Sequence, residues 1–358
     1  MRFSRSSLML AALFILLGLR PQTVTATEST APQPLPAGIH LPVKVHLSAR
    51  VLNISRIEET KGEVSARLEY TLSWRDDSHG FDPLAAGVYR QDFYGGEATG
   101  ALKAMWHPDV SITNQLSDPR SQSVAVSVTS EGDITVVRQI DADFRILVNL
   151  AAFPFDRQKL DFAFVAARYP TSEVIFTIDD RDRELSSISE SLSVADWHPG
   201  NLGFTLEQFY GWNAKPFVRA TVTATVERAW PRYLLRLFIP FAAVVSVSLF
   251  ILWAPEKLRL DHAGIIYSAL LALAALSFTF ESSFPGSMSV NSPIAFMISI
   301  GYFYLVLTLL VHLSLIYANI PVFSRYPFLR AEIRNNVRFV LPAIFTLVCV
   351  CSVVRSLT

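Results

Sequence analysis

The chain has 358 residues, of which 51% are hydrophobic, and its 31 lysine and arginine residues balance 31 acidic ones. A composition this apolar argues against an ordinary soluble protein of this length. The zero net charge, with no basic stripe interleaved with aromatic residues, argues against a nucleic-acid partner.

Residues 1–26 are predicted to be a secretory signal peptide. Arg2 and Arg5 supply a positive start, and the apolar stretch Leu8–Leu19 is too short to span a membrane comfortably. Small residues at Val24–Ala26 offer a cleavage site. The alternative is an uncleaved anchor. In both cases the residues that follow face away from the cytoplasm.

Residues 27–230 are predicted to form an all-β, immunoglobulin-like sandwich, entered through a proline-rich segment over residues 27–40. From Val43 to about Ala229, runs of alternating apolar and polar residues are separated by Gly, Asp and Ser. Strands at this spacing are typical of an antiparallel sandwich. The runs include residues 43–51, 64–74, 124–128, 134–136, 160–164, 174–178 and 218–226.

Residues 231–358 are predicted to form an all-α transmembrane domain, a bundle of four helices. Each of four apolar segments approaches the roughly 20 residues that a spanning helix needs. The predicted spans are residues 233–253, 262–280, 293–317 and 339–355.

The two cysteines, Cys349 and Cys351, both fall in the last apolar segment. Residues two apart lie on different sides of a helix, so these thiols cannot pair with each other. The exported domain is therefore predicted to have no disulfide. Cysteine spacing typical of a metal site is absent, and we expect no cofactor and no metal.

The links between the spans predict the orientation. Lys257 and Arg259 lie in the first link and four arginines lie in the third, whereas the second link, Glu281–Val290, has no basic residue. Because positive links stay in the cytoplasm, the N-terminal domain and the C-terminus are predicted to lie outside. This describes a multi-pass protein of the cell (inner) membrane whose sandwich is extracellular or periplasmic.

The second span carries a stripe of small, polar and apolar residues with a seven-residue repeat, as in helices packed nearly parallel. Asp261 and Glu281 bound this stripe at its two ends. In a ring of copies each position becomes a ring of side chains, which can line a pore and gate it. The alternative is an ordinary buried helix whose small residues permit close packing. The predicted pore-lining residues are Asp261, Gly264, Ser268, Leu271, Ala275, Phe278 and Ser282.

The segment Phe153-Pro154-Phe155-Asp156-Arg157-Gln158 resembles the signature loop of the Cys-loop receptor superfamily, the pentameric ligand-gated ion channels. The cysteines that flank this loop in animal members are missing here, as in bacterial members. Trp74-Arg75-Asp76, Trp106-His107-Pro108-Asp109 and the junction at Ile239-Pro240 match further family segments in the right order.

The resemblance implies a homopentamer in membrane lipid, not an enzyme, opened by a small extracellular agonist that binds between subunits. Phe278 and Pro342 make the membrane part look most like the amine-responsive bacterial branch, so an amine-like agonist is expected. Acidic Asp261 and Glu281 predict passage of monovalent cations, although Arg259 just inside Asp261 weakens that preference.

Agonists in this family bind in a box of aromatic faces, which hold a cation without a buried countercharge. The hairpin before the last strand is rich in aromatics, although it also fits a hairpin that packs on its own sheet. Thr113 stands where the family often has an aromatic residue, and Arg168 near the box would repel an amine or recruit an anion. The predicted ligand-binding residues are Tyr169, Tyr210, Trp212, Phe217 and Thr113.

Coupling between ligand and pore is expected where the signature loop, the turn at Glu58–Glu59 and Arg228 meet. Asp156 or one of the two glutamates is predicted to pair with Arg228. Pro154 and Phe155 are predicted to rest on the turn Ser283–Gly286. The predicted coupling residues are Glu58, Glu59, Pro154, Phe155, Asp156, Arg228, Phe284 and Pro285.

Two competing hypotheses remain. A membrane-anchored sensor that passes no ions fits the sandwich and the spans, but it does not explain the stripe on the second span. A membrane enzyme lacks support, because the Gly-x-Ser-x-Gly, His-Glu-x-x-His and phosphate-loop motifs are absent. The seven histidines are scattered, with His262 and His312 in different segments. Trp74 and Trp106 are expected in the sandwich core.

Overall fold

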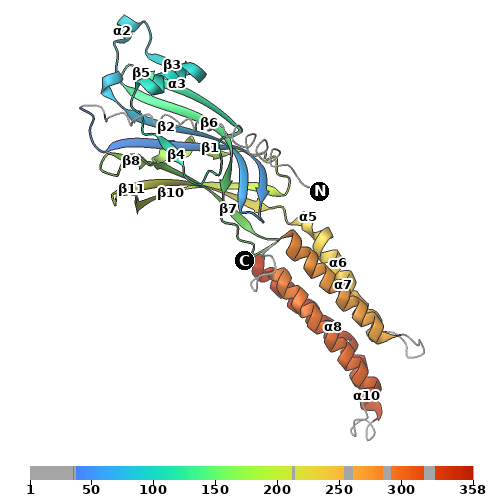
Figure 1. The fold of residues 1–358 in the computed structure, drawn as a ribbon. Coiled ribbons are helices and arrows are strands. Elements are labelled where there is room, and N and C mark those ends of the chain that lie inside the picture. Colours follow the sequence, from blue (N-terminus) through green and yellow to red (C-terminus); the bar gives the residue numbers. More distant parts are fainter. Residues whose placement is uncertain are drawn as a thin grey trace, which may run out of the picture. The chain divides into compact units, whose positions relative to one another are not determined.

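The computed structural model describes residues 35, 38–211, 214–253, 261–284, 292–317 and 327–357. The predicted signal peptide lies outside these residues. In chain order a strand-rich part is followed by a helical part (Figure 1). The strands are β1 Val43–Glu58, β2 Glu63–Arg75, β3 Arg90–Tyr94, β4 Val110–Ile112, β5 Ser121–Thr129, β6 Asp133–Arg145, β7 Arg157–Ala166, β8 Val174–Thr177, β9 Ser187–Ile188, β10 Trp197–Tyr210 and β11 Pro216–Arg228.

The strands form two sheets. One sheet has the order β3-β5-β6-β2-β1-β8, with β9 also paired to β1, and the other has the order β10-β11-β7-β4. Neighbouring strands pair antiparallel, except that β8 and β9 run parallel to β1. Strands β1 and β2 make a long hairpin, and β1 has irregularities between Val51 and Asn53 and between Ile54 and Arg56. Irregularities of this kind bend a strand and increase its local twist.

The core of the sandwich lies between the two sheets and is built by alternate residues of each strand. The Phe144 ring on β6 packs edge-on against Phe162 on β7, with centroids 5.0 Å apart. Tyr70 on β2 meets Phe164 on β7 at 5.1 Å. Together with the two-sheet topology, these contacts place the predicted period-two runs on the inner faces.

Trp74 and Trp106 are both buried, and their rings meet at 6.0 Å. The prediction that they belong to the core is confirmed.

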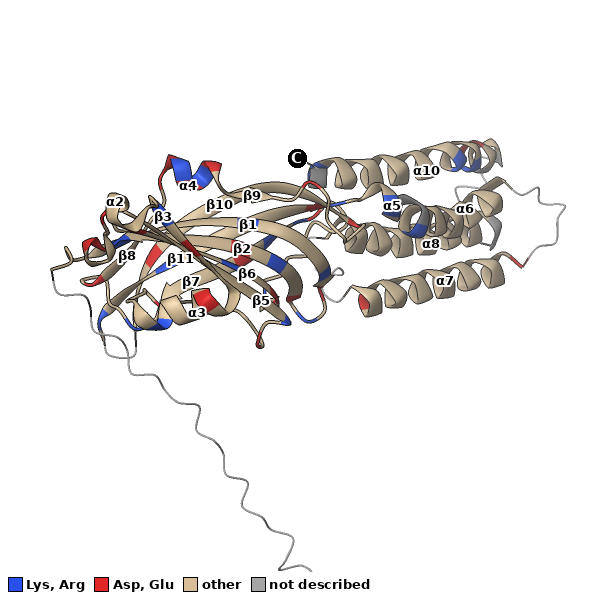
Figure 2. Cartoon of the chain, turned by 90° about the horizontal axis from the view of Figure 1, so that it is seen from above, with Lys and Arg blue, Asp and Glu red and all other residues tan. Residues whose placement is uncertain are grey.

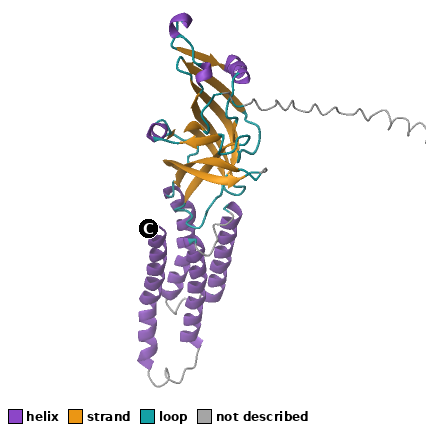
Figure 3. Cartoon of the chain, turned by 90° about the vertical axis from the view of Figure 1, so that its left-hand side faces the viewer, coloured by secondary structure: helices purple, strands orange, loops and turns teal. Residues whose placement is uncertain are grey.

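The helical part begins directly after β11, and Figure 3 shows its long helices beside one another. Four described helices are long and apolar enough to cross a membrane. The predicted fold class, a β-sandwich followed by four apolar helices, is confirmed. The helical elements are α5 Pro231–Tyr233, a π-helical turn Leu234–Phe238, α6 Ile239–Trp253, α7 His262–Ser283, α8 Pro293–Tyr317 and α10 Pro327–Leu357.

Charged residues lie mainly on the sandwich, while the long helices carry few charges between their ends (Figure 2). The predicted last span, residues 339–355, lies within the longer helix α10, whose charged first turns precede the apolar segment. The sequence did not predict the short helices in the sandwich, which are α2 Pro83–Ala86, α3 Gly95–Ala104 and α4 Asp180–Glu184.

Candidate functional site

Arg228, the last residue of β11, is the centre of a buried polar cluster where the sandwich meets the helices. Its side chain is only 1% exposed. The Nε atom donates to Asp156 Oδ1 at 2.6 Å, and an Nη atom donates to Asp156 Oδ2 at 3.0 Å. The other Nη donates to Glu59 Oε1 and to the Tyr233 hydroxyl, both at 3.1 Å. A bidentate, charge-assisted pair of this kind fixes both distance and orientation.

The predicted pairing of Arg228 with an acidic residue is therefore present, and it involves Asp156 and Glu59 together. Glu58 points elsewhere, because its carboxylate pairs with Lys61 at 2.7 Å and with Arg56 at 2.8 Å. The Lys61 ammonium holds the pKa of Glu58 below its usual value. Of the two glutamates predicted at this turn, Glu59 alone reaches the buried cluster among the described residues.

Aromatic rings surround the guanidinium of Arg228. Its central carbon lies 4.2 Å from the Trp197 ring centroid and 4.9 Å from that of Phe153. Burial by itself would lower the pKa of Arg228, but the hydrogen bonds and charge of Asp156 raise it above its ordinary value. The guanidinium therefore remains a cation inside the protein, and the rings replace part of its hydration.

The loop before β7 contacts the end of α7 through Phe153. Phe153 is fully buried, and its ring centroid lies 4.6 Å from that of Phe284 and 5.5 Å from that of Tyr233. Phe155 instead packs against Trp230 at 5.5 Å. Phe155 was predicted to rest on the turn after α7. In the described part of that turn, Phe153 makes this contact instead.

The backbone of this loop explains why the two phenylalanines differ. Phe153 N donates to Leu150 O at 3.1 Å, and Phe155 N donates to Ala152 O at 2.8 Å. These turns direct Phe153 with buried Leu150 into the hydrophobic cluster of the helices. Pro154 is also buried. Pro285, the last predicted coupling residue, lies outside the described residues.

Gln158 holds the two ends of the loop together, a role that the sequence did not predict. Its amide accepts from Asn149 N at 3.0 Å and donates to Asn149 O at 2.7 Å. It also donates to Asp156 Oδ2 at 2.6 Å, and its exposed fraction is 1%. The loop contains no cysteine, and this buried amide links residues 149, 156 and 158 without a disulfide.

Helix α7 shows one covered and one uncovered face. Ile266, Ala269 and Leu273 are buried against the neighbouring helices, whereas Leu271 and Phe278 are 73% and 75% exposed. Every predicted pore-lining residue except Gly264 is exposed in the single chain, and Gly264 is half-buried. The other described helices of the chain therefore leave the predicted stripe free.

Asp261 caps α7. Its carboxylate accepts from Gly264 N at 2.9 Å, which satisfies a free backbone donor of the first turn. A Cβ atom on residue 264 would collide with the carboxylate of Asp261. A larger residue at this position would therefore displace the Asp261 carboxylate from its cap.

The structure brings His262 and His312 together, although the sequence placed them in separate segments. Their ring centroids are 4.2 Å apart, at the start of α7 and late in α8. Sequence spacing alone gives no signal for this contact, because it depends on how the two helices pack.

Among the described residues, the predicted ligand-binding residues lie in different surroundings within the single chain. Tyr210 is 81% exposed at the end of β10, and Phe217 is 2% exposed with its ring 5.9 Å from that of Phe209. Tyr169 is buried, and its hydroxyl accepts from Trp106 Nε1 at 3.1 Å. Trp212 lies outside the described residues.

Thr113 lines a separate hollow of about 690 Å³, together with Glu207 and Arg219. Arg168, predicted to lie near the box, pairs with Asp109 at 2.8 Å. Its charge is therefore partly compensated within its own chain.

Comparison with known proteins adds independent findings. The family profile described as "Neurotransmitter-gated ion-channel ligand binding domain" matches residues 31–229. The chain is 21% identical over 317 residues to a proton-gated ion channel of Gloeobacter violaceus, covering 86% of this chain and 81% of that protein.

Animal channel subunits are also similar. A glutamate-gated chloride channel of Drosophila melanogaster is 21% identical over 68% of this chain and 52% of its own length. The acetylcholine receptor subunit alpha-type deg-3 of Caenorhabditis elegans is 20% identical over 80% of this chain and 53% of its own length. The chain thus spans about half the length of these animal proteins.

Proposed function

The chain belongs to the neurotransmitter-gated ion-channel family, and on this premise we propose that it is one subunit of a homopentameric, cation-selective channel opened by a small ligand. The observation that carries the proposal is the uncovered stripe on α7. Lipid alone would cover exposed Leu271 and Phe278, but it gives no reason for exposed Ser268 on the same stripe. Copies of the helix around a common axis place this mixed stripe around a pore.

In such a ring the stripe divides into a wetter and a drier part. Ser268 and Gly264 lie toward the capped end, and the Ser268 hydroxyl already donates to Gly264 O at 2.9 Å. Leu271 and Phe278 would form apolar rings whose narrowing expels water and stops conduction. Widening of these rings is the proposed opening step.

The Arg228 cluster supports a route from ligand to pore. One guanidinium joins the loop before β7, the β1–β2 turn and the first helical turn through Asp156, Glu59 and Tyr233. Phe153 extends this cluster to Phe284 at the end of α7. We propose that ligand binding favours one of two arrangements of this junction, and that the pore follows it.

An amine-like agonist is the proposed ligand, by resemblance and because Tyr210 offers an exposed aromatic face next to the hairpin. The names of the similar proteins refer to protons, glutamate and acetylcholine. The ligand screen therefore includes a pH series, amino acids and amines. The proposed setting is the inner membrane, with the signal peptide removed, the sandwich outside, and lipid around the outer helices.

A current recording tests the channel and its pore face together. The chain is expressed in oocytes or reconstituted, and small amines, amino acids and a pH series are applied. We expect a gated current in the wild type. In Leu271→Ser or Phe278→Ala we expect a resting current or a shift to lower agonist concentration, because a smaller or polar ring wets more easily.

The matched control is Phe303→Ala, a change at an exposed aromatic residue of α8. It is expected to leave gating unchanged. A particle count other than five subunits would support the membrane-anchored sensor instead. Equal effects of the α7 and α8 variants on gating would contradict the assignment of the α7 stripe as the pore face.

Replacing Asp261 tests cation preference without removing the helix cap. Asparagine caps a helix about as well as aspartate, whereas alanine loses about 0.5–2 kcal/mol of cap stability. Asp261→Asn is expected to shift the reversal potential under a salt gradient toward that of a non-selective pore. An unchanged reversal potential in Asp261→Asn would refute the role of this charge.

A further inference from the structure

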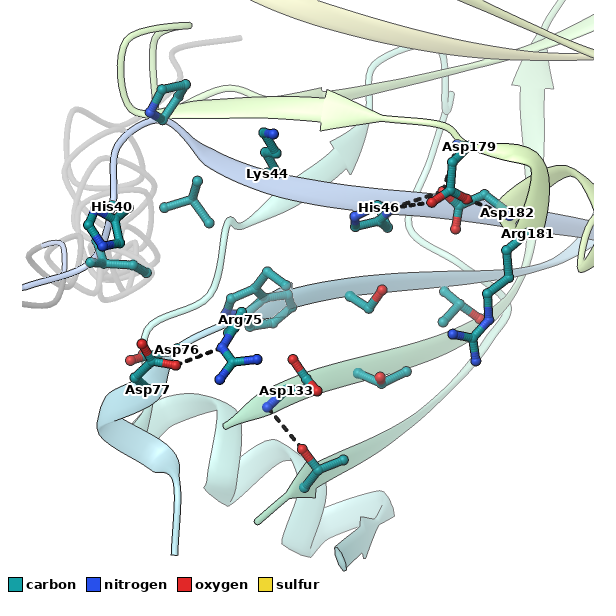
Figure 4. A pocket seen from close by; sticks show the side chains of 18 of the residues that line it. His40, Lys44, His46, Arg75, Asp76, Asp77, Asp133, Asp179, Arg181 and Asp182 are labelled. Atoms are coloured by element: carbon teal, nitrogen blue, oxygen red, sulfur yellow. Dashed lines mark hydrogen bonds and ion pairs between the residues drawn. The ribbon is translucent and has the colours of Figure 1, made fainter. Parts of the chain in front are cut away.

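A hollow of about 1050 Å³ opens beside β1 and β2, away from the Arg228 cluster. Figure 4 shows the side chains that line it, and three of them converge on one wall: His46 from β1, Asp179 before α4, and Asp182 within α4. The proposed channel function uses none of these three residues.

The three side chains point one ligand atom each toward a common point. His46 Nδ1 lies 3.0 Å from Asp182 Oδ2 and 3.5 Å from Asp179 Oδ2. All three ligand atoms lie within 4.8 Å of one another. Imidazole nitrogen and carboxylate oxygen are both ligands of zinc.

We propose that His46, Asp179 and Asp182 form a binding site for Zn²⁺, with the fourth coordination position open to the hollow. Bonds of about 2.0–2.2 Å at tetrahedral angles separate neighbouring ligand atoms by about 3.3–3.6 Å. The distances of 3.0 and 3.5 Å from His46 Nδ1 are within a few tenths of that separation. The two carboxylate oxygens lie within 4.8 Å of each other, so side-chain movements of about an ångström complete the geometry.

Hydrogen bonds hold both carboxylates in place before any ion arrives. Asp182 N donates to Asp179 Oδ1, and Asp179 N donates to Asp182 Oδ2, each at 3.0 Å. Asp179 therefore uses one oxygen for the helix cap and turns the other toward His46. Ser186 fastens α4 to β1, because its hydroxyl donates to Asp182 O at 2.6 Å and accepts from Ala49 N at 3.0 Å. Such outer contacts orient metal ligands.

The local charge also suits a divalent cation. Both carboxylates accept a backbone N–H, which favours their charged form. The guanidinium of Arg181 is directed away from the cluster in Figure 4. The guanidinium of Arg183 lies over the Phe204 ring, 5.8 Å from its centroid. The cluster thus holds two carboxylates and one imidazole, and the two charges of Zn²⁺ would balance those of the carboxylates.

A protonated His46 held between two carboxylates is the alternative, and zinc binding distinguishes the two. The full-length protein, purified in detergent, is titrated with Zn²⁺ by calorimetry, and Co²⁺ is added separately as a spectroscopic probe. We expect one Zn²⁺ per chain, a Co²⁺ visible spectrum of tetrahedral type, and weaker binding at lower pH, since protons compete for the imidazole nitrogen.

Three variants locate the site. His46→Gln removes the nitrogen ligand, and Asp179→Asn removes a charge while keeping an oxygen for the helix cap. Losing an outer-shell partner weakens metal binding about 10–100-fold, so losing a ligand is expected to weaken it at least about tenfold. His40→Gln, in the same hollow but outside the cluster, is expected to bind Zn²⁺ as the wild type does.

Circular dichroism and elution profiles that match the wild type show that the variants are folded, so that changes in Zn²⁺ affinity report on the site. Loss of binding in His46→Gln and Asp179→Asn, but not in His40→Gln, supports the site. Unchanged affinity in the first two variants, or no stoichiometric binding by the wild type at micromolar Zn²⁺, overturns it. A zinc-dependent rise in the melting temperature of the wild type, absent in His46→Gln, gives a second readout.

Discussion

Replacing Arg228 with alanine is expected to destabilise the protein by about 3–5 kcal/mol and to abolish gated current. The substitution leaves the Asp156 carboxylate, which is 1% exposed, without its countercharge. Breaking a buried ion pair by removing one partner has this magnitude, because an uncompensated charge remains in a place that water does not reach. Glu59 and the Tyr233 hydroxyl lose a donor in the same step.

Guanidinium-induced unfolding of the detergent-purified protein measures this effect, with tryptophan fluorescence as the signal. Trp197 lies against the guanidinium of Arg228 at 4.2 Å and reports on the cluster directly. The matched control is Arg232→Ala. Arg232 pairs with Asp196 at 3.2 Å with both side chains more than half exposed, so a loss below about 1 kcal/mol is expected.

Two more variants separate charge from geometry. Arg228→Lys keeps a cation but cannot make the bidentate contact with Asp156, so we expect surface expression with a shifted ligand response. The double variant Arg228→Met with Asp156→Leu removes both charges and is expected to be more stable than Arg228→Ala. Equal stability of Arg228→Ala and Arg232→Ala would contradict the assignment of Arg228 as the centre of the junction.

Replacing Phe153 with alanine is the second large effect that we expect. Phe153 is fully buried among Phe284, Tyr233 and Arg228. Truncating a buried phenylalanine costs about 3–5 kcal/mol, because apolar contacts are lost and a cavity remains. Ligand-gated current is expected to fall with it, since the ring is the described contact between this loop and the end of α7.

Phe155→Ala is the matched variant two residues away. Its side chain is only partly buried and packs on Trp230, so its stability loss is expected to be smaller than that of Phe153→Ala. Denaturation midpoints and current amplitudes of the two variants, normalised to surface protein, make the comparison. A larger effect of Phe155→Ala would restore the original prediction that Phe155 carries the contact.

The sequence predicted the sandwich and the four helices because both follow local periodicity. Alternation in β2 matches the side chains that face the second sheet, and long apolar segments match the helices. Helix α10 extends beyond the predicted span because the span was bounded by hydropathy, which does not report backbone conformation in a charged turn. Helix α3 has mixed polarity with two buried residues, so it gave little periodic signal.

At the candidate site, charge complementarity was predictable and side-chain direction was not. The resemblance to the Cys-loop receptors implied that the loop, the turn and Arg228 meet at one junction, and opposite charges there predicted the pairing. Turns within the loop decide whether Phe153 or Phe155 packs on Phe284, and the residue types do not specify these turns. The roles of Gln158 and Trp197 at this site were not predicted, because one amide or one ring produces no repeating pattern in the sequence. The burial of Phe217 and Tyr169 is likewise a property of the assembled sheets.

The Arg228 cluster also sets an order of events during synthesis. Glu59 and Arg228 are 169 positions apart in the chain, and Asp156 precedes Arg228 by 72 positions. At about 5–20 residues per second, the ribosome delivers Arg228 about 8–34 seconds after Glu59. Until then the two carboxylates stay hydrated, and the end of the sandwich stays open. The strand that closes the sandwich and the first membrane helix therefore arrive together, so the domain finishes folding only as its anchor reaches the membrane.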